Sequence, residues 1–72
     1  MTQQLLCAVG AALYGRDWQS PLARDLEVSD RTVRRWVAGT HAPPPGIATD
    51  LLRLAVKRAQ VLDDLAEQLR TA

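Results

Sequence analysis

The chain has 72 residues, one cysteine, one histidine and a formal net charge of +1, which leaves room for a single small domain. A lone cysteine excludes an intrachain disulfide, and one His with one Cys cannot supply the three or four ligands of a zinc site. We therefore expect no metal and no cofactor. Domains this small often gain stability by oligomerisation, which remains the candidate here.

The sequence contains no signal for export. The apolar run from Leu5 to Val9 is short and has no basic residue before it, which argues against a signal peptide. No apolar stretch is long enough to cross a membrane. Because the chain also lacks paired cysteines, we expect a cytoplasmic protein with no membrane partner.

The first predicted helix covers Gln3–Tyr14 and is followed by Gly15, which favours a helix end. A second, short helix is predicted from Ser20 as cap and Pro21 as first helical residue to Leu26. Trp18, just before it, is expected to pack against this helix. The apolar stripe that predicts the first helix consists of Leu5, Leu6, Val9, Ala12 and Leu13.

A third helix is predicted between Ser29, which can cap it, and Gly39, which can end it. Its apolar stripe is Val33, Trp36 and Val37. If that stripe packs inward, the opposite face carries Asp30, Arg31, Arg34 and Arg35. The segment from His41 to Gly46 holds three consecutive prolines and is expected to be an extended spacer.

A fourth helix is predicted over residues 47–70, which contain neither glycine nor proline. It would be about 36 Å long, longer than a three-helix unit of this size can cover. We therefore expect a second copy of the chain to bury its later apolar positions, giving a homodimer. The predicted dimerisation residues are Leu51, Ala55, Leu62, Leu65, Ala66 and Leu69.

The segment Gln19–Ala38, QSPLARDLEVSDRTVRRWVA, resembles the helix-turn-helix of the Cro/cI-type (XRE-like) regulators of phages and bacteria. The likeness is carried by Gln19, Ala23, the turn Leu26–Val28, Val33 and Trp36. It implies an all-α fold: a tri-helical helix-turn-helix core, with the motif at about 19–38, followed by the C-terminal dimerisation helix, in one domain spanning 1–72. Glu27 stands where the family usually has glycine, and a left-handed Glu27 would cost roughly 1 kcal/mol.

The resemblance also assigns site residues. The family's base-reading positions fall on Asp30, Arg31, Arg34 and Arg35, and arginine can donate two parallel hydrogen bonds to guanine. For Asp30, a role in favouring the helix N-terminus or orienting a neighbouring arginine is equally compatible with the sequence. Arg16 and Arg24 could equally be solvated surface residues. The predicted phosphate contacts are Gln19, Ser20, Ser29, Thr32, Arg16 and Arg24.

These assignments predict a sequence-specific transcriptional regulator that binds double-stranded DNA. A homodimer would place two helices in successive major grooves about 34 Å apart and read an inverted repeat, acting as a repressor of its own promoter. No small-molecule ligand is expected. Among small regulators of this length, the chain looks like the anti-CRISPR-associated (Aca) repressors of phages and mobile elements.

Two other functions fit the same sequence. The chain could be a protein-interaction module whose last helix recruits a partner, or an antitoxin whose C-terminal segment neutralises a toxin. An enzyme is disfavoured, because no His, Cys or Ser stands with a plausible base and no phosphate-binding glycine loop is present, so no catalytic residue is assigned.

Overall fold

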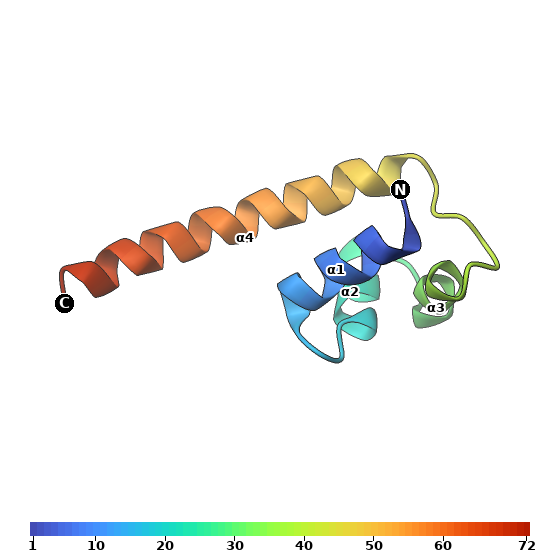
Figure 1. Ribbon diagram of the computed structural model, residues 1–72, viewed down its shortest axis with the longest axis horizontal. Helices are drawn as coiled ribbons and strands as arrows, with labels where there is room; N and C mark the ends of the chain where they lie inside the picture. The colour runs from blue at the N-terminus through green and yellow to red at the C-terminus, as the bar shows by residue number, and fades with distance from the viewer.

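The computed structural model describes residues 1–72 and is entirely helical. Its four helices are α1 (Gln3–Tyr14), α2 (Gln19–Leu26), α3 (Asp30–Ala38) and α4 (Gly46–Arg70). Helices α1 to α3 pack together, and the first half of α4 lies along α1 (Figure 1). The predicted all-α class is confirmed, and α1 has the bounds predicted from its apolar period.

Local capping explains where two of the helices begin. The Thr2 hydroxyl oxygen accepts the Leu5 N–H at 3.0 Å, and the Ser29 hydroxyl oxygen accepts the Thr32 N–H at 3.1 Å. The prediction that Ser20 caps the second helix is wrong. That helix begins two residues earlier than predicted, at Gln19, with Trp18 at the cap position and no side-chain cap bond.

The hydrophobic core takes residues from all four helices. Trp18 lies against Gly10 of α1, where an added Cβ would stand 2.1 Å from the indole ring, so no larger residue fits. On α1 the inward face differs from the prediction: Leu5 and Ala12 are exposed, and Gly10 is buried in their place. The core consists of Leu6, Trp18, Leu22, Ala23, Val33, Trp36, Ile47 and Leu51.

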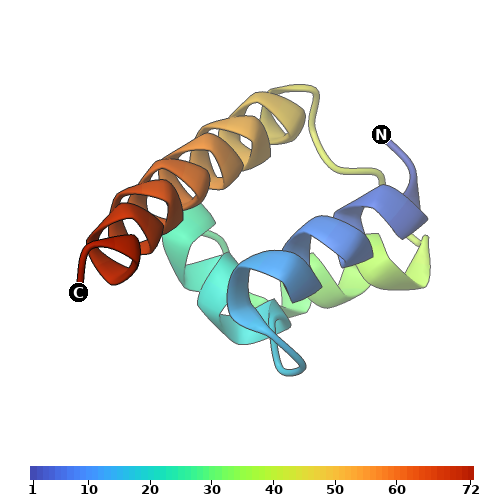
Figure 2. The ribbon, with the colours of Figure 1, turned by 60° about the vertical axis from the view of Figure 1, so that its left-hand side comes forward.

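Helix α4 is packed along one half only. Arg58 Nη1 donates a hydrogen bond of 2.7 Å to the Leu13 carbonyl at the end of α1, and beyond that point α4 stands clear of the other helices (Figures 1 and 2). We call residues 62–70 the overhang, and α1 to α3 with residues 46–61 the body. The apolar residues of the overhang, Leu62, Leu65 and Leu69, are exposed.

Leu51 lies in a different place from the one expected for a dimerisation residue. It is only 3% exposed and belongs to the core of its own chain, because the first turns of α4 pack on the body. The predicted stripe therefore divides: Leu51 is buried within the chain, the two alanines are half-buried, and Leu62, Leu65 and Leu69 are exposed.

Candidate nucleic-acid interface

A three-residue connection, Glu27 to Ser29, joins α2 to α3. Glu27 has φ 59° and ψ 40°, the only non-glycine residue of the chain with a positive φ. The turn is closed by a bond of 2.9 Å from the Val28 N–H to the Ala23 carbonyl. A left-handed non-glycine residue costs roughly 1 kcal/mol, which the packing of α2 on α3 must offset.

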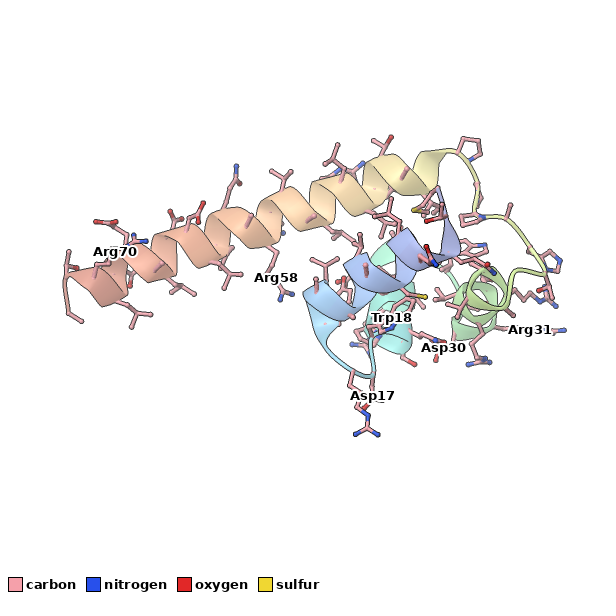
Figure 3. The ribbon with its side chains drawn as sticks, in the orientation of Figure 1. Asp17, Trp18, Asp30, Arg31, Arg58 and Arg70 are labelled. Atoms are coloured by element: carbon pink, nitrogen blue, oxygen red, sulfur yellow. The ribbon has the colours of Figure 1, made fainter.

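The orientation of α3 is fixed by its buried face. Val33 is fully buried and Trp36 is 4% exposed, as the sequence predicted, while Val37 is half-buried. At 100° per residue, the direction opposite to Val33 and Trp36 is that of Arg31 and Arg34. Both arginines are exposed, and in Figure 3 the side chain of Arg31 extends away from the molecule.

Arg35 and Ala38 complete the outward side of α3. Arg35 is half-buried, so its guanidinium lies at the edge of this face, and Ala38 is exposed one turn after Arg34. We call Arg31, Arg34, Arg35 and Ala38 the arginine face. The sequence analysis missed Ala38, although its spacing of four residues from Arg34 and seven from Arg31 gives the signal.

Asp30 lies beside the arginine face and is already engaged. Its carboxylate accepts a hydrogen bond of 2.7 Å from the Ser20 hydroxyl, which links the first turn of α2 to the first turn of α3. Figure 3 shows Asp30 on the side of α3 that faces the α2 region. Two residues predicted to contact DNA separately, Ser20 at a phosphate and Asp30 at a base, are thus bonded to each other in the free chain.

The other predicted phosphate contacts lie at or just before helix starts, except Arg24, which lies in the last turn of α2. Ser29 and Thr32 stand at the start of α3, with their hydroxyl oxygens 2.9 Å apart in a shared hydrogen bond. Gln19 is half-buried at the start of α2, and Arg16 is exposed in the turn before it. Arg24 is exposed on α2. Free N–H groups at helix starts suit anionic ligands, so these positions stay predicted phosphate contacts.

Both ends of α3 are held to the rest of the body. At its C-terminal end the Gln3 side-chain amide donates to the Val37 carbonyl at 3.2 Å, a contact that joins α1 to α3. The sequence analysis missed this role of Gln3, because a contact across 34 residues leaves no local pattern. With Ser20 and Asp30 at the other end, α3 is held as a rigid support for its exposed side chains.

The arginine face has no charge partner. Only two ion pairs form in the chain, Arg53–Asp50 and Arg70–Glu67, each at 3.0 Å and each on α4. Arg31, Arg34 and Arg35 form none, and neither do Arg16 and Arg24. Five guanidinium groups of the body are therefore open to an external anion.

No protein-family model, no curated protein sequence and no solved structure matches this chain. The chain also contains no helix that is both long and apolar enough to span a membrane, and no group of three His, Cys, Asp or Glu side chains positioned to hold a metal ion.

Proposed function

We propose that the chain is a transcriptional regulator that binds double-stranded DNA with a helix-turn-helix formed by α2 and α3. The observation that carries this proposal is the two-sided character of α3. One side is anchored by Val33 and Trp36 inside the body, and the other presents Arg31 and Arg34 without an ion partner.

A B-DNA major groove is about 12 Å wide and admits one α-helix. With α3 in the groove, Arg31 and Arg34 can each donate two hydrogen bonds to guanine O6 and N7, and the methyl group of Ala38 can contact a thymine methyl. Ser29 and Thr32 then contact the phosphates that flank the groove and so position the body on the DNA. Asp30 orients the start of α3 through Ser20 in this proposal.

A single α3 contacts too few base pairs to select one site in a genome, so the proposal includes a homodimer that reads an inverted repeat. Such a protein would repress a promoter by occupying it. The resemblance to Cro/cI-type regulators supports this mode, and its narrower form is an anti-CRISPR-associated repressor that controls its own promoter. In this proposal the concentration of the protein itself is the regulatory signal.

The test is selection of bound fragments from random DNA, followed by affinity measurement on the recovered site. Arg34→Ala should lower the affinity for that site by about tenfold, since a bidentate arginine–guanine contact is worth about 1–3 kcal/mol. The matched control is Arg53→Ala, which removes the same charge from α4 and should change affinity little. Recovery of no sequence, or equal affinities for Arg34→Ala and the parent chain, would count against this reading face.

The exposed overhang supports a second candidate, a protein-interaction module or antitoxin whose last helix binds an unrelated chain. Leu62, Leu65 and Leu69 are all exposed on the last turns of α4, and neighbouring exposed apolar residues are typical of interaction surfaces. Co-purification with a partner that is lost in Leu62→Lys, together with no DNA binding by the parent chain at low salt, would favour this candidate over the regulator.

A further inference from the structure

Helix α4 carries an apolar stripe that begins away from the side packed on the body, at Ala48 and Leu52, and comes into line with the buried Leu51 at Leu62 and Leu69. Its members are separated by alternating steps of four and three residues over the whole helix, and all of them are alanine or leucine. This is the spacing of a coiled-coil seam. We call it the outer seam; it consists of Ala48, Leu52, Ala55, Ala59, Leu62, Ala66 and Leu69.

The leucines of the outer seam are exposed, and of its alanines Ala48 and Ala59 are exposed while Ala55 and Ala66 are half-buried. Leu52 is 64% exposed, Leu62 57% and Leu69 76%. Leu52 follows the buried Leu51 directly, so a turn of about 100° separates the side that meets the body from the side that does not. The seam therefore does not depend on the overhang alone, because Ala48 and Leu52 are exposed on the half of α4 that packs on the body.

We propose that two copies of the chain pair through the outer seam in antiparallel orientation, with the two-fold axis passing beside Ala59. This inference rests on the homodimer of the proposed function and names its residues and its direction. Two features of the outer seam support it: the order of large and small residues and the area that pairing would cover.

An antiparallel pair centred on Ala59 places every leucine of the seam opposite an alanine. Leu69 meets the partner's Ala48, Leu62 meets the partner's Ala55, and Leu52 meets the partner's Ala66. A large side chain opposite a small one fills the space between two helices evenly. Each pair occurs twice, because the partner's leucine also meets the matching alanine of the first chain. The surface is therefore complementary to itself, as a two-fold interface requires.

A parallel pair in register fits less well. It would place Leu52, Leu62 and Leu69 each opposite its own copy, and leave four layers in which alanine meets alanine. Leucine layers hold two helices further apart than alanine layers do, so the alanine layers would contain gaps. The difference in packing therefore selects the antiparallel orientation.

The area is sufficient for a stable pair. Covering the seam in both copies removes on the order of 1,000 Å² of mostly apolar surface from water, which is the lower bound for a specific interface. Because the outer seam reaches both ends of α4, each overhang lies along the half of the partner's α4 that is joined to the partner's body. Leu62 and Leu69 lose their exposure in this arrangement.

Disulfide cross-linking without DNA tests the direction. In a Cys7→Ala background, an equimolar mixture of the variants Ala48→Cys and Leu69→Cys should give a covalent dimer on oxidation, and Leu69→Cys alone should not. Ala59→Cys alone should cross-link, because the two-fold axis brings that position to its own copy. Cross-linking of Leu69→Cys alone as fast as the mixture would overturn the antiparallel orientation.

Sedimentation tests whether the outer seam forms the interface. Ala59→Glu should raise the dissociation constant of the dimer at least about tenfold, since it puts a longer, charged side chain at the closest approach. The control Gln60→Glu adds the same charge about 100° around α4 from Ala59, outside the outer seam, and should leave the dimer unchanged. A monomeric parent chain, or equal effects of both variants, would reject the seam, and neither readout depends on DNA binding by the arginine face.

Discussion

Helix α3 and the overhang of α4 lack opposite kinds of partner. On α3 the apolar side is fully packed within the chain, and the charged side has no ion pair. On the overhang, Arg70 is paired with Glu67, while Leu62, Leu65 and Leu69 stay exposed. The first pattern suits a polyanion, whose phosphates supply the missing charge. The second suits another apolar helix, which supplies the missing packing.

The two surfaces also differ in how water solvates them in the unbound chain. Exposed arginines are charged and solvated, so the arginine face is stable in water without DNA. Exposed leucines order water around them, and covering them is favourable by roughly 25 cal/mol per Å². Association through α4 is therefore expected to persist in the absence of DNA, whereas the arginine face acts only when a target is present.

Trp36→Ala removes a buried anchor of α3 and should have the largest effect on stability. Removing a buried tryptophan costs about 3–5 kcal/mol, a large part of the stability of so small a body. Urea unfolding followed by circular dichroism, at protein concentrations below dimerisation, measures the loss. The control Leu69→Ala removes an exposed leucine from the overhang and should change unfolding by less than about 0.5 kcal/mol.

Similar midpoints for Trp36→Ala and Leu69→Ala would mean that α3 is not anchored by Trp36. The arginine face would then have no fixed direction, and its proposed role would lose its structural basis.

A pair of glycine substitutions sharpens the contrast between the close-packed body and the open side of α4. Gly10→Ala drives a methyl group into the Trp18 ring and should destabilise the body by about 1–3 kcal/mol. Gly46→Ala meets no atom within 4 Å and should be neutral or stabilising by up to about 1 kcal/mol. Thermal unfolding of both variants gives the comparison, and a stabilised Gly10→Ala would contradict the close contact with Trp18.

The smallest expected effect concerns Tyr14, which lies where the body meets the exposed half of α4. Burial, with the hydrogen bond to Asp25 and the charge of that carboxylate, raises the pKa of Tyr14 from 10.0 to about 12, while the Arg58 guanidinium opposes the rise. The neutral phenol is thus favoured in the folded chain. Its contribution to stability is present below pH 10 and is lost as the pH rises toward 12.

The measurement is a titration of phenolate absorbance, which reports this residue alone because the chain has one tyrosine. The midpoint should lie near 12 in the folded chain and near 10.0 in denaturant. Asp25→Asn should move the folded midpoint back toward the ordinary value. A midpoint near 10.0 in the parent chain, with its helical signal intact, would show that Tyr14 is not hydrogen-bonded to Asp25 in solution.

Sequence reasoning predicted most of what depends on neighbouring residues. The bounds of α1 and α3, the cap at Ser29 and the burial of Val33 and Trp36 all follow from period and capping. It failed where a distant contact decides. The predicted stripe of α1 left out Gly10, whose burial depends on contact with Trp18. Ser20 was predicted as a cap because Pro21 follows it, and its bond to Asp30, which joins two helices, leaves no local pattern.

By itself the sequence determined the four helices and the direction of the arginines on α3, because helical period and the transfer of apolar groups from water act along the local chain. Only the tertiary structure decided that the end of α1 lies beside Arg58 of α4, so that one half of α4 is covered and the other is not. It also separated Leu51, which lies in the core, from the outer seam. The reason is physical: an apolar stripe marks a side of a helix for burial, but the length of its neighbour decides how much of that side is covered within the chain.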